Sequence, residues 1–110
     1  MEPAVRSFTY RRRIKVSPGD LMLAKAGKKT CTIRLGNNKV EGNAIDLSDG
    51  SDSLRVRILS VETKPFSELT EKHAKSEGFE TLEQLRSDLA KYYGQIEEAQ
   101  PVTVISFSRD

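Results

Sequence analysis

Residues 27–34, with the sequence GKKTCTIR, constrain the fold most, because they combine a turn and a strand within eight positions. The preceding residues 20–26 predict one or two helical turns, and Gly27 suits the left-handed conformation that commonly follows a helix end. Further along, Cys31 and Ile33 alternate with polar residues. This period of two predicts a strand that turns Cys31 and Ile33 toward a core.

The other face of this predicted strand is strongly polar. Thr30, Thr32 and Arg34 alternate with the apolar positions, so two hydroxyls and a guanidinium share one face. Lys28 and Lys29 lie in the turn that leads into the strand. Folding alone rarely requires so many polar side chains around one short strand. The polar face is suited to hold an anion or a polar ligand.

Length and composition predict one soluble domain. The chain has 110 residues, of which 36% are hydrophobic and 31% charged, so residues 1–110 suffice for one core and not two. No apolar run approaches the length of a membrane span, and residues 1–13 do not resemble a secretory signal. We therefore expect a cytoplasmic protein with no membrane partner, and the sequence indicates no particular oligomeric state.

The chain contains one cysteine and one histidine. Cys31 cannot form an intramolecular disulfide and lacks the companion residues of a zinc site, so we expect no metal and no other cofactor. Its inward position predicts a core residue. The alternative is a catalytic thiol, for which His73 is the obvious base.

Charge is distributed unevenly, although the net charge is only +2. Residues 1–40 contain ten Lys and Arg against two acidic residues, whereas residues 41–110 contain eight against fourteen. Such asymmetry predicts a basic face, to which Arg55 and Arg57 in a later strand would add. This face could meet phosphates, or the acidic helices could neutralise it within the folded chain.

The rest of the chain predicts a scaffold of strands and helices. The expected elements are a first strand within residues 11–16 with basic side chains at a solvated edge, a connecting loop at 35–42, an antiparallel hairpin of strands 42–47 and 53–61, helices at 67–77 and 81–93, and a last strand at 102–107. This order favours an α+β domain with a curved sheet or closed barrel and short flanking helices.

The second predicted helix carries an apolar stripe at helical spacing. Leu82, Leu85, Leu89 and Tyr92 recur along one side, which predicts packing against the sheet and not a ligand surface. The aromatic residues of the chain are likewise expected mostly in the core, which gives little support for stacking several bases of an RNA.

The first predicted helix differs, because its inward stripe is polar. Counting from Leu69, the residues at helical spacing are His73, Ser76 and Glu77. Glu77 also stands in the last turn, where the helix dipole disfavours a negative charge. A carboxylate held inward at this position suits general acid or base chemistry, and the alternative is a frayed helix end with Glu77 in water.

These two segments, residues 27–34 and 69–77, resemble the ASCH domain, and particularly its small bacterial members. The resemblance extends from about residue 21 to the carboxyl terminus. It implies a PUA-like β-barrel with helices at one side. Some members hydrolyse the amide of N4-acetylcytidine to cytidine and acetate, while others are suspected RNA-binding modules or a ribonuclease.

By motif position, the resemblance assigns Lys29, Thr32 and Glu77 as catalytic residues. Arg34 would lie in the strand that lines the cleft, with Lys28 and Thr30 as further substrate-binding residues. The polar strand face would then hold a modified nucleoside. The resemblance is weaker in the basic first strand and in residues 36–53.

Our first hypothesis is a metal-independent amidohydrolase that acts on a modified nucleoside such as N4-acetylcytidine. Thr32 would supply the nucleophile, Lys29 would accept its proton, and Glu77 would protonate the departing amine. Strict alternation would place Lys29 opposite Thr32, so this scheme requires Lys29 to lie in the turn that Gly27 permits. Otherwise Lys28 is the better oriented amine.

The alternative hypothesis is a non-catalytic RNA-binding module. The lysines would then engage RNA phosphates together with Arg34, Arg55 and Arg57, and affinity would fall steeply with added salt. A small uncharged nucleoside would show little such dependence.

Overall fold

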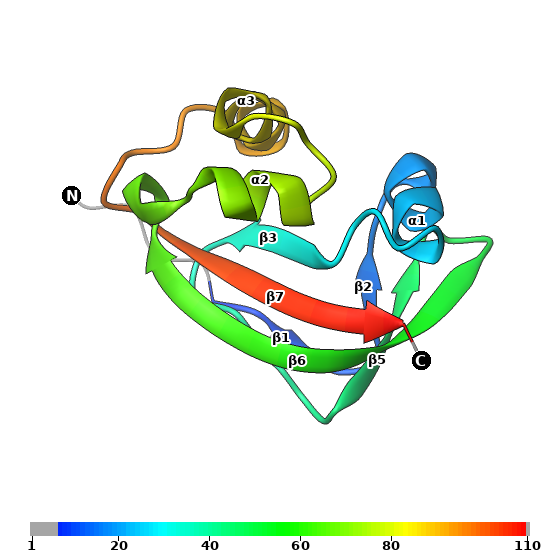
Figure 1. The fold of residues 1–110 in the computed structure, drawn as a ribbon. Helices are drawn as coiled ribbons and strands as arrows, with labels where there is room; N and C mark the ends of the chain where they lie inside the picture. Colours follow the sequence, from blue (N-terminus) through cyan, green and yellow to red (C-terminus); the bar gives the residue numbers. More distant parts are fainter. Residues whose placement is uncertain (1–6, 110) are drawn as a thin grey trace.

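Residues 7–109 are described by a computed structural model and fold around one curled, open sheet (Figure 1). The elements in chain order are β1 (Thr9–Tyr10), β2 (Arg13–Lys15), α1 (Pro18–Lys25), β3 (Cys31–Leu35), β4 (Lys39–Val40), β5 (Ala44–Ser48), β6 (Ser53–Pro65), a 3-10 turn η1 (Phe66–Glu68), α2 (Glu71–Ser76), α3 (Leu82–Tyr93) and β7 (Pro101–Arg109). The five-stranded sheet forms half a barrel, with short helices at its sides. This arrangement confirms the expected α+β class with a curved sheet.

The sheet has the strand order β2-β5-β6-β7-β3. Strand β2 pairs in parallel with β5, and the other neighbours are antiparallel. The hairpin of β5 and β6 around Asp49 and Gly50 is therefore confirmed. A break in register between Ile58 and Ser60 interrupts the β6–β7 ladder, and such an irregularity bends a strand and increases its twist. The curl of β6 in Figure 1 follows from this bend and from the usual strand twist.

The prediction for the basic first strand is confirmed, whereas the prediction for the connecting loop is wrong. Strand β2 lies at the edge of the sheet with Ile14 fully buried and Arg13 and Lys15 exposed, which confirms the predicted edge strand. The segment 35–42, expected as a plain connector, instead contains β4, which pairs in parallel with β1. Propensity missed this pairing because β1 and β4 are only two residues long and far apart in sequence.

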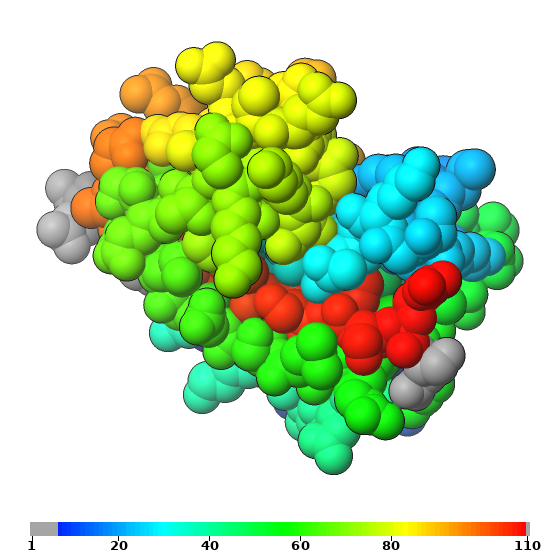
Figure 2. Space-filling model, in the orientation of Figure 1, coloured from blue at the N-terminus to red at the C-terminus, as the bar shows by residue number. Residues whose placement is uncertain are grey.

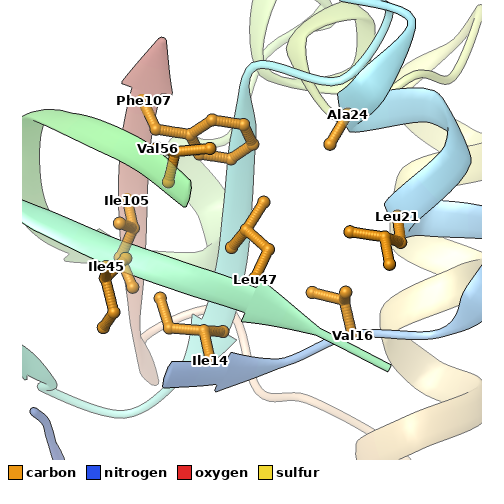
Figure 3. Packing of buried hydrophobic residues seen from close by; sticks show 9 residues of the cluster. All are labelled: Ile14, Val16, Leu21, Ala24, Ile45, Leu47, Val56, Ile105 and Phe107. Carbon is orange, nitrogen blue, oxygen red and sulfur yellow. The ribbon is translucent and has the colours of Figure 1, made fainter. Parts of the chain in front are cut away.

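Apolar side chains fill the concave side of the sheet under α1 (Figure 3). Serine at position 17 caps α1 by accepting a hydrogen bond from the Asp20 amide, and Pro18 occupies its first turn. The buried members of this cluster are Ile14, Val16, Leu21, Ala24, Ile45, Leu47, Val56, Ile105 and Phe107. They come from β2, β5, β6, β7, α1 and the segment between β2 and α1, and Figure 3 shows them gathered in one interior space.

A second apolar cluster lies on the opposite face of the sheet, beneath α2 and α3. Strand β7 contributes to both clusters, since Val102 and Val104 face α2 and α3, while Ile105 and Phe107 face α1. Cys31 and Ile33 of β3 belong to the helical side, so Cys31 is confirmed as a core residue with 1% exposure. Thr32 between them therefore faces the concave side.

The helix predicted at 67–77 is shorter than expected. Leu69 has an extended backbone (φ −68°, ψ 141°), so α2 begins only at Glu71, and the stripe counted from Leu69 does not continue through one helix. His73 is half-buried, and its Nδ1 accepts a hydrogen bond from the Thr70 amide (2.9 Å), so it caps the helix start. Only Glu77 of the expected polar stripe is buried.

The helices form two separate rises on the molecular surface, α1 over the first apolar cluster and α2 with α3 over the second. Figure 2 shows α1 in blue on one side and the green and yellow segments of α2 and α3 on the other, with the red strand β7 running below both. Within residues 7–109, the helices are too short and too polar to cross a lipid bilayer. The segment that joins α1 to β3 lies between the two rises, and it carries residues 27–30.

Removing the Leu85 side chain tests how far the second cluster supports the fold. Leu85 is fully buried under α3, so we expect Leu85→Ala to lower the free energy of unfolding by about 2–5 kcal/mol. Urea denaturation followed by circular dichroism measures this change. Ser87→Ala is the matched control, because Ser87 is exposed on the same helix and should change stability by at most about 0.5 kcal/mol. Equal effects of the two variants would contradict the packing described here.

Candidate active site

A cavity of about 370 Å³ lies between α1, β3, the end of α2 and the carboxyl end of α3. Polar and apolar groups share its walls. Its lining residues are Lys15, Val16, Ser17, Pro18, Asp20, Lys29, Thr32, Ile33, Arg34, Asp49, Glu77, Asp88, Leu89, Tyr92 and Tyr93. The cavity therefore gathers residues from most of the chain, and its size is in the range of small-molecule sites.

The turn after α1 places Lys29 in this cavity. Gly27 adopts a positive φ of 78°, and the backbone amides of Lys28 and Lys29 both donate to the Leu23 carbonyl, at 2.8 Å and 3.2 Å. These bonds end the helix and turn the chain before the strand begins at Cys31. As a result Lys29 does not follow the strand alternation, and its side chain is only 3% exposed.

Glu77 reaches the same place from the end of α2. The Thr30 amide donates to the Ser76 carbonyl (2.7 Å), so the start of β3 and the end of α2 are bonded to each other. Gly78 permits this approach, because a Cβ there would lie 3.2 Å from Leu23 Cδ1, and its φ of 95° also favours glycine. Lys29 precedes Thr30 and Glu77 follows Ser76, so this bond brings the two side chains together. They form a buried ion pair, in which the Lys29 side chain is 3% exposed and the Glu77 side chain 6%.

The surroundings of Lys29 favour its uncharged form. Burial lowers the pKa of the Lys29 amine, while the carboxylates of Asp20 and Asp88 act in the opposite direction and Arg34 reinforces the decrease. The Glu77 carboxylate in direct contact offers a second place for the proton. A proton in this pair can therefore be carried on nitrogen or on oxygen, within one water-poor pocket.

Thr32 and Arg34 form the next part of the wall. The Thr32 side chain is 3% exposed, and its Oγ1 accepts a hydrogen bond from Arg34 Nε (3.1 Å). Arg34 Nη2 in turn donates to the Lys15 carbonyl (2.8 Å), which ties β3 to the edge strand β2. The hydroxyl is thus held beside a fixed positive charge, with its own proton available for donation.

The structure divides the site residues predicted from sequence into two groups. Lys29, Thr32, Arg34 and Glu77 line one cavity, whereas Lys28 is exposed outside it. Thr30 is also exposed and lines a different surface hollow beside Phe107 and Arg109. Of the two lysines left open by the sequence, Lys29 is the one in the cavity.

Residues of α3 that the sequence placed in the core also line the cavity. Leu85 and Leu89 pack in the second apolar cluster as predicted, and Leu89 also lines the cavity; Tyr92 is 65% exposed, so its predicted packing is wrong and it forms cavity wall. Asp88 stands one helical turn before Tyr92, and burial together with the nearby Asp20 raises the pKa of its carboxyl. Asp88 and Tyr92 are four residues apart, so the sequence places them on the same side of the helix. It does not reveal that this side of α3 meets β3 and lines the cavity.

The carboxylates of the cavity do not form a metal centre. Across residues 7–109, no three His, Cys, Asp or Glu side chains gather closely enough to hold an ion. The chemical groups that the cavity offers are instead two amines, two hydroxyls, a guanidinium, carboxyl groups and two phenols.

Comparison with known proteins places these residues in context. A family model described as the ASCH domain matches residues 17–109. Two curated proteins named N(4)-acetylcytidine amidohydrolase, from Vibrio vulnificus strains YJ016 and CMCP6, are each 38% identical to this chain over 89 residues. The matched part covers 76% of this chain and 82% of each relative.

Solved structures share the fold at low sequence identity. An ASCH domain from Lactobacillus crispatus JV V101 superposes with a TM-score of 0.69 at 15% identity, covering 94% of this chain and 79% of that one. A protein from Enterococcus faecalis V583 superposes with a TM-score of 0.61 at 20% identity, covering 100% of this chain and 79% of that one. These likenesses concern the path of the backbone.

A double-mutant cycle tests the buried pair. Lys29→Met leaves the Glu77 carboxylate buried without its partner, and Glu77→Leu does the same to the amine, so each should lower the free energy of unfolding by about 3–5 kcal/mol. Lys29→Met/Glu77→Leu removes both charges and should be more stable than either single variant. Urea denaturation at pH 7 measures all four proteins. Additive losses in the double variant would contradict the pairing.

The reactivity of Cys31 tests the alternative of a catalytic thiol. Burial raises the pKa of the Cys31 thiol from 9.0 to about 11, which lowers its thiolate fraction at pH 8 about a hundredfold. We expect iodoacetamide to alkylate the folded protein at least about a hundredfold more slowly than the protein unfolded in guanidinium, with the folded rate still rising above pH 9. A folded rate within tenfold of the unfolded rate, or a plateau below pH 8, would contradict this assignment.

Proposed function

Since this chain belongs to the ASCH domain family, we propose that it is an amidohydrolase that removes the acyl group from a modified nucleoside such as N4-acetylcytidine. The observation that carries the proposal is the buried Lys29–Glu77 pair in the same cavity as the Thr32 hydroxyl. The name of the two Vibrio vulnificus relatives supports the choice of N4-acetylcytidine as substrate. The cavity volume of about 370 Å³ suits a nucleoside better than a large polymer.

The first step forms an ester on Thr32. As Thr32 Oγ1 attacks the acetyl carbonyl, its proton passes to the uncharged Lys29 amine, and the carbonyl oxygen takes up the negative charge. Burial lowers the pKa of the Lys29 amine, so its uncharged form is easier to reach than that of a lysine in water. Arg34, which already donates to Thr32 Oγ1, supplies positive charge beside the oxygen where the new bond forms.

The second step breaks the bond between carbon and nitrogen. Glu77 donates a proton to the exocyclic nitrogen, so that cytidine departs as a neutral amine and the acetyl group remains on Thr32. Water then attacks the ester with Glu77, now a carboxylate, as base, while Lys29 returns its proton to Thr32 Oγ1, which releases acetic acid and restores the hydroxyl and the starting protonation of the pair. One amide and one water are consumed, and one amine and one carboxylic acid are formed.

Burial explains how one pair serves as base and acid together. In a water-poor pocket the neutral arrangement, amine with protonated carboxyl, loses less hydration energy than the ionic arrangement. We propose that the reaction starts when the ionic pair passes to this neutral arrangement by moving one proton from Lys29 to Glu77, so that Lys29 accepts a proton while Glu77 holds one to donate. The same residues exposed in water would stay charged at neutral pH, with neither able to play its part.

A binding function for RNA is the second candidate, and one observation favours it. Arg13 and Lys15 are exposed on the edge strand β2, and Lys15 also lines the cavity. Arg55 on β6 is less available, because it pairs with Asp46 at 3.2 Å. Arg57 likewise has an interaction of its own. Arg13 and Lys15 are therefore the basic side chains best placed to contact an RNA phosphate, whereas Arg55 interacts within the protein.

Release of cytidine from N4-acetylcytidine tests the proposal. The variants remove the proposed chemical role of a side chain while keeping its charge or its approximate shape. Lys29→Arg keeps a positive charge near Glu77 but cannot accept a proton, so kcat/KM should fall by about 10²–10⁴. Thr32→Val removes the nucleophile and should abolish ester formation, whereas Thr32→Ser should retain part of the rate. Glu77→Gln removes the acid and should lower kcat.

Lys28→Arg is the matched control for Lys29→Arg, since Lys28 is the exposed neighbour outside the cavity. Its kcat/KM should stay within about twofold of the original protein. Thermal denaturation verifies that each variant is folded. If the intact protein releases no cytidine, yet binds single-stranded RNA with an affinity that falls steeply with salt, the amidohydrolase proposal fails and the binding module takes its place.

A further inference from the structure

A second cavity, of about 410 Å³, adjoins the first one. Arg34 and Tyr93 line both, so the two cavities share a wall. The rest of the second cavity is formed by the amino-terminal segment and the turn after β3, through Phe8, Tyr10, Leu35 and Asn38, together with Ser7. None of the steps proposed for amide hydrolysis uses this space.

The exposed Phe8 and the half-buried Tyr10 form an aromatic pair at the second cavity. The Phe8 ring is 58% exposed, and its centroid lies 4.8 Å from that of Tyr10 with an interplanar angle of 58°. The sequence placed both residues in the core, and for Phe8 this prediction is wrong. The Phe8 ring packs against Tyr10 on one side, and its open side lines the second cavity.

The backbone under Phe8 is firmly held. Its amide donates to Asn38 Oδ1 (3.0 Å), and its carbonyl accepts from the Lys39 amide (2.8 Å). Asn38 is only 4% exposed, and its own amide donates to the buried Thr103 hydroxyl (2.9 Å). The open ring is therefore displayed from a fixed position, which reduces the entropy lost when it binds a ligand.

Arg34 connects this aromatic surface to the proposed nucleophile. Its guanidinium donates to Thr32 Oγ1 on one side. On the other side it lies near Tyr10, where burial raises the pKa of the phenol and Arg34 acts in the opposite direction. Arg34 Nε and one N–H of Nη2 are bonded to Thr32 Oγ1 and the Lys15 carbonyl, and the rest of this positively charged group, at the boundary of two cavities, is suited to a phosphodiester that crosses from one to the other.

From this arrangement we infer that the second cavity is a stacking subsite for a nucleobase adjacent to the acylated cytidine, so that the substrate is N4-acetylcytidine within a short single-stranded oligonucleotide. The inference rests on the proposed function, because the first cavity must hold the acylated base. The neighbouring base stacks on the open face of Phe8 with the tilted Tyr10 ring beside it, and the linking phosphate lies at Arg34. Every base has a π face, so this subsite accepts any neighbour.

The aromatic surface fits a base better than the acyl group itself. An acetyl group has one methyl and gains little from a ring that remains more than half open to water. A base covers the whole ring and keeps its polar edge in solvent. The exposed cations Lys15 and Lys39 nearby also favour a ligand that carries phosphate.

Steady-state kinetics with matched substrates test the inference. The substrates are N4-acetylcytidine, dinucleoside monophosphates that join it to adenosine on its 5′ or 3′ side, and the same compounds with an abasic ribose in place of adenosine. We expect one dinucleotide to have a kcat/KM about tenfold above that of the nucleoside, with the abasic compound in between. Equal rates for dinucleotide and abasic compound would overturn the stacking subsite.

Substitution of Phe8 separates stacking from a structural effect. Phe8→Ala should lower kcat/KM for the favoured dinucleotide about five- to tenfold and leave the free nucleoside within about twofold, while Phe8→Tyr should retain the preference. Leu59→Ala is the matched control, because Leu59 is 61% exposed and lies away from both cavities. An equal loss for both substrates in Phe8→Ala would assign Phe8 a structural role and overturn the inference.

Failure of the inference can be told from failure of the proposed function. Hydrolysis of the nucleoside with no preference for either dinucleotide overturns only the subsite. If no compound is hydrolysed, calorimetric binding of unmodified cytidylyl-adenosine, in both linkage orders, against cytidine decides the subsite separately. Tighter binding of one dinucleotide that is lost in Phe8→Ala supports it, and equal binding of all three ligands overturns it.

Discussion

The hydrogen bond from the Thr30 amide to the Ser76 carbonyl is the contact on which the site depends, because it joins two segments that are distant in the chain. It brings the residues on either side, Lys29 and Glu77, into one buried pair. Gly27 and Gly78 make the approach possible, one by turning the chain and the other by leaving room for Leu23. Without this junction the amine and the carboxylate would each be solvated, and neither would have unusual chemistry.

Much of the fold was predictable, because the hairpin, the last strand and α3 have strong local signals. The alternation of Cys31, Thr32 and Ile33 identified which side of β3 is polar, and the structure confirms it. Whether Lys29 or Lys28 faces the cavity depended on the turn before β3. Gly27 indicated that a turn was possible there but not which lysine it would turn inward. The start of α2 was misplaced because Leu69 is extended, a choice that tertiary packing makes and helical spacing cannot reveal.

The walls of the cavities were less predictable than the residues proposed for chemistry. Tyr92 follows an apolar helical period, and only the way α3 ends beside β3 makes it part of a wall. Phe8 was expected in the core because aromatic residues usually are, yet the short β1–β4 pairing displays it at the surface. The proposed substrate contacts therefore depend on distant segments that meet in the fold, whereas the groups proposed to react lie in two short motifs.

The central claim is that Thr32 carries the acyl group while the Lys29–Glu77 pair moves the protons. Rapid quenching of a single turnover with N4-acetylcytidine, followed by mass spectrometry of the digested protein, tests it directly. The account predicts that the peptide containing Thr32 gains the mass of one acetyl group as cytidine appears and loses it as acetate forms. Cytidine release with no acetyl group on Thr32 at any time, or with the acetyl group on Lys29, would contradict it.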